Sequence, residues 1–308
     1  MTVQPRGFAS RAIDSDLLHA FTRSPLTMAA AAVTALIFLS AAFAPLISPS
    51  DPFDLASLSL LDSLTPPAWE EGGNPAYLLG TDDQGRDLLS AILYGTRISL
   101  GVGFASVALA ATLGITLGLL AGYVGGAVDT VIMRVADVQL TFPAILIALL
   151  IDGTARALFP EVSREESAFT VLTLSIGLSF WVQYARTVRG STLVEANKEY
   201  VMAARLIGLS RITIMARHVL PNVLGPVLVI ATINLALAII LEATLSFLGV
   251  GVPPTQPSLG TLIRVGQDYL FSGEWWITMF PGAMLAVLVL AVNLLGDWLR
   301  DALNPKLR

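Results

Sequence analysis

Glu242 stands out among the residues that could do chemistry, because it lies inside an otherwise apolar stretch of the chain. A carboxylate is unfavourable in such a stretch, so Glu242 is a candidate for binding a substrate or carrying a proton. It lies about two helical turns from the predicted end of the stretch. There the carboxylate could instead accept hydrogen bonds within a helix bundle or face a wet cavity, and the sequence leaves these interpretations open.

Three aspartates, Asp82, Asp83 and Asp87, lie close together around Gly85. Such a cluster could bind calcium, but it lacks the alternating oxygen ligands and the terminal glutamate of an EF-hand loop. Aspartate also caps helices, and glycine readily adopts the left-handed backbone that tight turns require. The pattern therefore favours a capped turn over an ion site.

Catalytic and nucleotide-binding motifs are absent. The chain has no cysteine, and its two histidines, His19 and His218, lie in separate segments, so no metal pair is expected. Its two lysines, Lys198 and Lys306, do not follow a glycine, which excludes a Gly-x-x-x-x-Gly-Lys-Ser/Thr phosphate-binding loop. The sequence therefore predicts no catalytic residue, no metal site and no cofactor, and the chain is not expected to be an enzyme.

The composition is that of an integral membrane protein. The 308 residues are 55% hydrophobic and 13% charged, whereas soluble domains carry about 25% charged residues. A helix that crosses about 30 Å of hydrocarbon needs about 20 apolar residues, and apolar windows of that kind predict six spans. They are residues 28–47, 98–124 and 131–151, and the windows from Glu166 to Arg186, from Arg217 to about residue 248 and from Glu274 to Asp297.

The spans divide the chain into four parts. Residues 1–24 form a polar tail, 25–47 the first span, 48–97 an extramembrane segment and 98–308 a core of five spans. The first apolar window exceeds the usual length of a signal peptide, so we expect an uncleaved anchor. Thirteen of the eighteen lysines and arginines fall on the side of the N-terminus if the spans alternate. The positive-inside rule then places both termini in the cytoplasm.

Small residues and a proline predict how two spans pack and bend. Gly114, Gly118, Gly122 and Gly126 recur at every fourth position, which favours close approach of a second helix. In the third span Pro143 removes a backbone hydrogen bond, which predicts a kink.

A charged interruption of the apolar pattern, the loop at 190–221, separates the fourth and fifth spans. Residues 195–207 predict a short helix that ends at Gly208. Ser210 predicts the cap of a second helix, which runs to about residue 219. The predicted first helix has four residues on one face, namely Tyr200, Ala203, Ala204 and Ile207.

Two interpretations of the loop remain open from these residues alone. The two short helices are tethered to two membrane helices, so they could transmit a rigid-body motion. They could equally form an amphipathic segment that lies on lipid headgroups and is held there by arginines.

The order Glu199-Tyr-Val-Met-Ala-Ala-x-x-x-Gly208, followed by Leu220-Pro221, resembles the cytoplasmic loop signature of ABC importer permeases. The family pattern is Glu-Ala-Ala, three residues, Gly, and then Leu-Pro at the same distance. Met202 stands where a glutamate is usual. The spacing from Ala203-Ala204 to the glycine and to Leu-Pro is intact.

Five further motifs resemble one branch of that family, the second (C-type) permease subunit of dipeptide, oligopeptide and nickel importers. The motifs are Leu-Gly-Thr-Asp-x-x-Gly-Arg-Asp at 79–87, Tyr-Gly-x-Arg-x-Ser-Leu at 94–100, Gly-Tyr-x-Gly-Gly at 122–126, Glu-Ala-x-Leu-Ser-Phe-Leu-Gly at 242–249 and Gly-Asp-x-Leu-Arg-Asp at 296–301. The resemblance covers roughly residues 20–305.

The resemblance implies an all-α type I ABC importer permease with six transmembrane helices in the bacterial cytoplasmic (inner) membrane. Its implied partners are a homologous permease subunit, two ATP-binding subunits, an extracytoplasmic solute-binding protein and membrane lipid, with no nucleic acid. The implied substrates are di- or oligopeptides. By this analogy the ATPase-coupling loop contains Glu199, Met202, Ala203, Ala204, Gly208, Leu220 and Pro221.

Two alternatives remain. The chain could be a stand-alone proton-coupled secondary transporter that uses Glu242. It could also be a nickel or glutathione permease of the same family, which these motifs do not distinguish from a peptide permease.

Overall fold

The computed structural model describes residues 21–54, 58–158 and 164–302, so most of the predicted tail at 1–24 lies outside the described residues. Within these ranges the chain is built from helices and has no strand, apart from an isolated bridge between Thr81 and Asp87. The predicted all-α fold is confirmed for this part of the chain.

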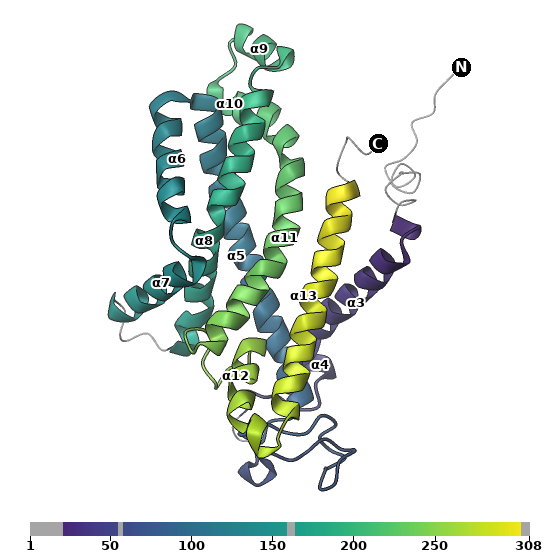
Figure 1. Ribbon diagram of the computed structural model, residues 1–308. Helices are drawn as coiled ribbons and strands as arrows, with labels where there is room; N and C mark the ends of the chain where they lie inside the picture. Colours follow the sequence, from purple (N-terminus) through teal and green to yellow (C-terminus); the bar gives the residue numbers. More distant parts are fainter. Residues whose placement is uncertain (1–20, 55–57, 159–163, 303–308) are drawn as a thin grey trace, which may run out of the picture.

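The described elements are joined mostly by short connections, with a longer irregular segment before α5 (Figure 1). In chain order they are α3 (Pro25–Ala42), α4 (Ala44–Ile47), η1 (Leu60–Asp62), α5 (Leu88–Val124), α6 (Gly126–Leu140), α7 (Ala144–Leu158), α8 (Arg164–Glu195), α9 (Glu199–Leu206), α10 (Arg211–Ile214), the π-helical turn η2 (Met215–Val219), α11 (Leu220–Phe247), α12 (Leu259–Tyr269), η3 (Leu270–Ser272) and α13 (Trp276–Ala302).

Five helices are long and apolar enough to cross a membrane, and α6 and α7 together could form a sixth, bent span. The six predicted spans therefore correspond to α3, α5, the α6–α7 pair, α8, α11 and α13. The span predicted near 131–151, with a kink at Pro143, consists of two separate helices, α6 and α7, which are bent by 95° relative to each other. The second span also begins earlier than predicted, at Leu88.

The break between α6 and α7 has a local cause. Pro143 follows the end of α6, where its ring disfavours a helical backbone at Phe142. Before α6, Gly125 and Gly126 both have positive φ angles, of 68° and 57°, and so reverse the chain sharply after α5. Pro143 was expected to kink a helix, and here it separates two helices.

The glycines of α5 pack against α8, as their spacing predicts. A Cβ atom on Gly114 would lie 2.3 Å from Cβ of Tyr184, and one on Gly118 would lie 2.6 Å from the carbonyl oxygen of Ala185. Gly122 meets Thr192 in the same way. The prediction that Gly126 continues this face is wrong, because α5 ends at Val124 and nothing lies within 4 Å of a Cβ there.

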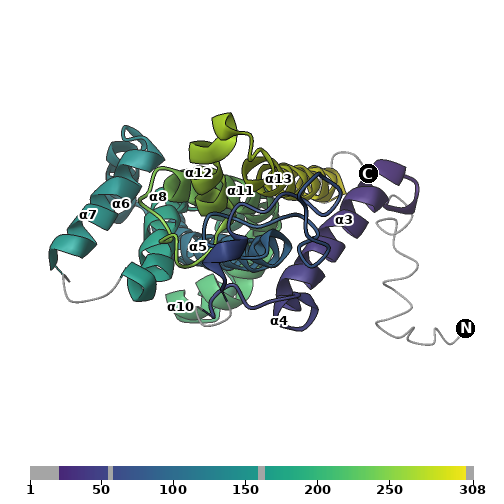
Figure 2. The same cartoon turned by 90° about the horizontal axis from the view of Figure 1, so that it is seen from below.

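The helices place the described chain ends on one side of the molecule. Figure 1 shows α9 at the same end as the start of α3 and the end of α13. The opposite end holds α4, α12 and the segment between α4 and α5. Figure 2 views that opposite end, where this segment lies over α5 beside α12 and α13. This arrangement is what six alternating crossings require.

The aspartate cluster forms a capped turn. Asp82 Oδ1 accepts hydrogen bonds from the backbone N–H groups of Gln84 and Arg86, at 2.9 and 3.0 Å. Gly85 has a φ of 76°, and Asp87 caps α5 by accepting from the N–H of Ser90 at 2.8 Å. The turn that the sequence favours is therefore confirmed.

Arg86 joins this turn to a distant loop. Its Nε atom lies 2.6 Å from Asp82 Oδ2, and both side chains are almost completely buried. Its Nη1 atom donates to the carbonyl oxygen of Pro254 at 2.8 Å. One guanidinium therefore holds the segment before α5 against the loop between α11 and α12.

We expect Arg86→Met to lower the free energy of unfolding by about 3–5 kcal/mol, because it leaves the Asp82 carboxylate buried without its partner. The matched control is Arg156→Met, since the pair Arg156–Asp152 has an arginine that is 42% exposed and should contribute less than about 1 kcal/mol. Thermal unfolding of the purified variants in detergent checks this. Equal destabilisation by both changes would contradict it.

Candidate functional site

Helix α9 forms the tip of the loop between α8 and α11. Glu199 lies in its first turn and Arg205 in its last, where each charge complements the helix dipole. Gly208 ends it with a φ of 81°, and the N–H of Leu209 donates to the carbonyl of Ala204. The predicted stop at Gly208 is confirmed. The predicted start at 195 is wrong, because α8 continues to Glu195 and a turn precedes α9.

The second helix of the loop does not stand apart from the membrane span. Ser210 caps α10, as predicted, by accepting from the N–H of Thr213 at 3.2 Å. From there the helix continues through the π-helical turn η2 into α11. The wider turn places the N–H of Leu220 on the carbonyl of Met215, directly before Pro221. Pro221 therefore enters α11 without ending the helix.

The two alanines of the motif lie on different faces of α9. Ala204 is 4% exposed and packs inward with Val201, whereas Ala203 is exposed. The side of α9 that packs on the rest of the molecule therefore includes Val201 and Ala204 and leaves Ala203 at its edge. The two alanines do not form one buried surface within this chain.

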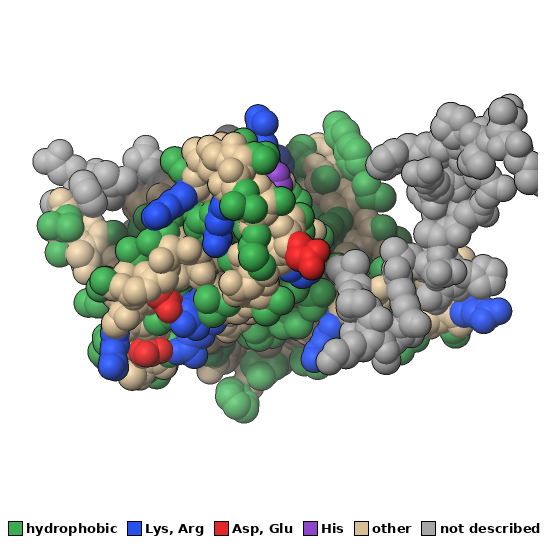
Figure 3. Space-filling model, turned by 90° about the horizontal axis from the view of Figure 1, so that it is seen from above, with side chains coloured by type: hydrophobic (Ala, Val, Ile, Leu, Met, Phe, Trp, Pro, Cys, Tyr) green, Lys and Arg blue, Asp and Glu red, His purple; other side chains and the backbone are tan. Residues whose placement is uncertain are grey.

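Several large apolar side chains are exposed at the tip, among charged ones. Met202 is 47% exposed, Leu206 88%, Ile207 75% and Ile212 74%. Figure 3 views this end of the molecule, where hydrophobic side chains are interspersed with lysines and arginines. Leu206 and Ile212 were not among the residues predicted for this loop, although both are large apolar residues in a charged segment. We call Met202, Leu206, Ile207 and Ile212 the apolar tip.

Tyr200 connects α9 to both flanking helices. Its hydroxyl lies 2.6 Å from Glu195 Oε2 at the end of α8. It lies 3.2 Å from the carbonyl oxygen of His218 and accepts from Asn222 Nδ2 at 3.0 Å. Burial, followed by the hydrogen bond to Glu195 and that residue's charge, raises the pKa of Tyr200 above its ordinary value. The phenol is therefore a protonated donor at neutral pH.

Two further contacts hold the loop. Lys198 Nζ lies 2.5 Å from Glu195 Oε1. The guanidinium of Arg205 lies over the ring of Tyr123, 5.1 Å from its centre, and so ties α9 to the end of α5. Of the remaining motif residues, Leu220 is half-buried and Pro221 is exposed at the start of α11. The structure thus gathers the predicted loop residues at one end of the molecule.

Glu242 lies far along α11 from this loop. Its side chain is fully buried, with Oε2 2.5 Å from the hydroxyl of Ser99 on α5 and Oε1 2.7 Å from the hydroxyl of Ser246. The sequence left open whether Glu242 accepts hydrogen bonds within the helix bundle or faces a wet cavity. The structure shows hydrogen bonds within the bundle.

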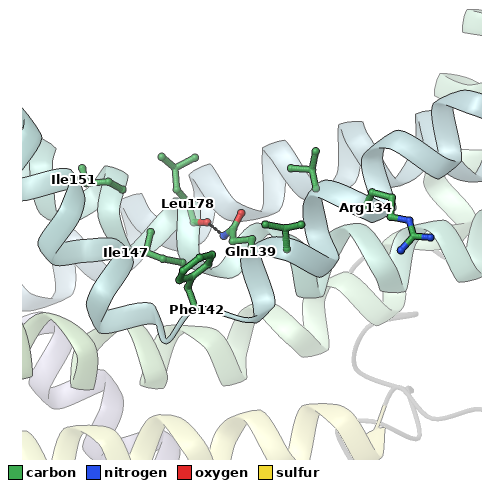
Figure 4. A pocket seen from close by; sticks show the side chains of 8 residues that line it. Arg134, Gln139, Phe142, Ile147, Ile151 and Leu178 are labelled. Carbon is green, nitrogen blue, oxygen red and sulfur yellow. Dashed lines mark hydrogen bonds between the residues drawn. The ribbon is translucent and has the colours of Figure 1, made fainter.

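A cavity of about 520 Å³ lies at the bend between α6 and α7 (Figure 4). Gln139 spans its base, donating to the carbonyl of Leu178 and accepting from the indole N–H of Trp181. The remaining lining is apolar apart from Arg134. No sequence pattern predicted this cavity, because it arises from the 95° bend.

These features define a class, the membrane-spanning component of a transporter, with an exposed tip at one end of its long helices. Residues 114–308 match the family described as the binding-protein-dependent transport system inner membrane component, and the chain belongs to this family. Residues 15–67 match the N-terminal TM domain of oligopeptide transport permease C. The protein is a multi-pass permease subunit of a bacterial inner-membrane ABC importer, and it works with other ABC transporter subunits.

Three permease proteins of dipeptide or di/tripeptide transport systems are similar to this chain over most of its length. The chain is 40% identical over 273 residues to the dipeptide transport system permease protein DppC of Haemophilus influenzae, covering 89% of this chain and 88% of that protein. It is 41% identical over 273 residues to the di/tripeptide transport system permease protein DppC of Pseudomonas aeruginosa, covering 89% and 86%. Identity to DppC of Escherichia coli K12 is 40% over 291 residues, covering 94% and 92%.

Solved structures support the fold. The inward-facing MetNI methionine ABC transporter aligns with a TM-score of 0.54 at 17% sequence identity, covering 70% of this chain and 98% of that chain. A second crystal form of MetNI aligns with a TM-score of 0.53 at 19% identity. The fold is that of a type I ABC importer permease.

Proposed function

We propose that this chain translocates di- or oligopeptides, and that its α9 docks on an ATP-binding subunit. The proposed complex contains a second, homologous permease, two ATP-binding subunits and a solute-binding protein on the outer side. The peptide substrate is supported by the names of relatives that are about 40% identical over most of the chain.

The apolar tip of α9 carries the proposal for docking. Leu206 and Ile207 are among the most exposed large apolar residues of the described chain, and they lie on a short helix between charged residues. Surfaces of this kind on proteins mark sites that a partner covers. Because α9 is fixed to α5, α8 and α11, a force on the tip acts on three membrane helices.

The proposed orientation places α9 in the cytoplasm, where ATP is available. The described ends of the chain lie on the α9 side, and thirteen of the eighteen lysines and arginines belong to the segments assigned to that side. The positive-inside rule supports this orientation.

ATP dependence is the test that separates this proposal from a proton-coupled carrier. We expect the complete complex in proteoliposomes to take up radiolabelled alanyl-alanine only when ATP is supplied on the α9 side. A protonophore should leave the uptake unchanged. Uptake by the isolated chain on a proton gradient, abolished by Glu242→Gln, would instead support the carrier.

Competition tests the substrate class in the same vesicles. Excess unlabelled dipeptide should reduce the uptake, whereas glutathione and Ni²⁺ should not. Uptake of radiolabelled glutathione or Ni²⁺ by the same vesicles, with no uptake of the dipeptide, would replace the peptide proposal with the corresponding permease of the same family.

A further inference from the structure

Tyr200 is the one residue of α9 for which the structure records side-chain hydrogen bonds to both flanking helices. It reaches Glu195 at the end of α8, His218 in the π-helical turn η2 and Asn222 at the start of α11. The other α9 contacts act differently: Val201 and Ala204 are buried among apolar side chains, and Arg205 stacks on Tyr123 of α5. The helices α8 and α11 also pack directly on each other, so the hydroxyl of Tyr200 adds a polar connection from α9 to both.

The geometry of this hydroxyl allows two states. A phenol has one proton, which it can donate to one acceptor at a time. The nearer acceptor is Glu195 Oε2 at 2.6 Å, and the second is the His218 carbonyl at 3.2 Å. Asn222 Nδ2 donates to both the hydroxyl and that carbonyl, at 3.0 and 2.7 Å. The hydroxyl can therefore turn its proton from Glu195 Oε2 to the His218 carbonyl, while Lys198 still donates to Glu195 Oε1 and Asn222 still donates to the hydroxyl.

The α11 side of this node is the π-helical turn η2, which contains His218. A π turn is a place where a helix changes its hydrogen-bond register, and such turns are frequent at functional sites. Tyr200 contacts α11 at the point where the helix is least regular. A shift of α9 can there be converted into a rotation or bend of the span.

We propose that Tyr200 is a positioning residue that passes a motion of α9, imposed by an ATP-binding subunit, to both α8 and α11. This inference rests on the proposed docking of α9 and adds the residue through which the motion passes. Tyr200 needs no contact with substrate or nucleotide in this role.

Tyr200→Phe tests the proposal, because it removes the hydroxyl and keeps the ring. Val201, Ala204 and Arg205 still hold α9, so the ATP-binding subunits should still co-purify. In proteoliposomes with the complete complex, alanyl-alanine taken up per ATP hydrolysed should fall about tenfold, as expected for loss of a hydrogen bond to a charged group. Asn222→Ala should reduce the ratio, and the double variant should be no worse than Tyr200→Phe.

Tyr94→Phe is the matched control, since Tyr94 lies on α5 against Phe53 and away from the loop. It should leave uptake per ATP unchanged. An unchanged ratio in Tyr200→Phe, or loss of the ATP-binding subunits from that variant, would overturn the inference. The proposed docking fails separately, if the subunits remain bound after the apolar tip is made charged.

Discussion

Replacing Leu206 and Ile207 together by aspartate should remove the ATP-binding subunits from the purified complex while the chain stays folded in the membrane. Both side chains are largely exposed, at 88% and 75%, so aspartate is tolerated in the free chain. Each apolar side chain contributes about 1.5–3 kcal/mol when it is buried against a partner. Losing both should weaken association more than about 100-fold. Affinity purification followed by quantitative gel analysis measures the bound subunits.

Leu61→Asp is the control for this prediction. Leu61 is 97% exposed and belongs to η1, at the opposite end of the molecule from α9. It undergoes the same chemical change and should leave the ATP-binding subunits bound. Retention of the subunits by the Leu206→Asp, Ile207→Asp variant would show that α9 is not the docking element.

The packing of α5 on α8 should be equally sensitive to small additions. Alanine at Gly114 or Gly118 would bring Cβ within 2.6 Å of a backbone carbonyl oxygen of α8, which forces the two helices apart. Overpacking of this kind costs about 1–3 kcal/mol for each site. We expect the double variant Gly114→Ala, Gly118→Ala to accumulate poorly and to unfold at a clearly lower temperature in detergent.

Gly190→Ala provides the comparison within the same helix pair. Gly190 lies in α8, and nothing lies within 4 Å of a Cβ there. Alanine is favoured over glycine in a helix by about 1 kcal/mol, so this variant should be as stable as the original or slightly more stable. A similar loss in both variants would mean that the contact of α5 with α8 does not explain the effect.

Local patterns predicted most of the fold. The lengths of the apolar windows predicted the six spans, since the thickness of the hydrocarbon layer sets the length of a helix that crosses it. Glycine at every fourth residue gave the α5–α8 contact, because that spacing places Gly114, Gly118 and Gly122 on one face. Asp82 and Gly85 predicted the capped turn, because the hydrogen bond and the backbone angle that form it involve only neighbouring residues.

The errors arose where neighbours far apart in the chain decide the outcome. Pro143 predicts a disruption, but the 95° bend depends on how α6 and α7 each pack on α8. Ala203 and Ala204 are alike in sequence, and the contacts of α9 with the helices beside it bury one and expose the other.

By itself, the sequence determined the class of this protein. Its low charge and long apolar windows require a membrane bundle, and the spacing from Ala203-Ala204 to Gly208 and Leu220-Pro221 carries the resemblance to importer permeases. Only the tertiary structure decided how the loop is held. Tyr200, Glu195 and Asn222 meet through hydrogen bonds between helix ends that are separated along the chain, and no local spacing rule specifies such contacts. It also buried Glu242 beside Ser99, because burial depends on which helices become neighbours.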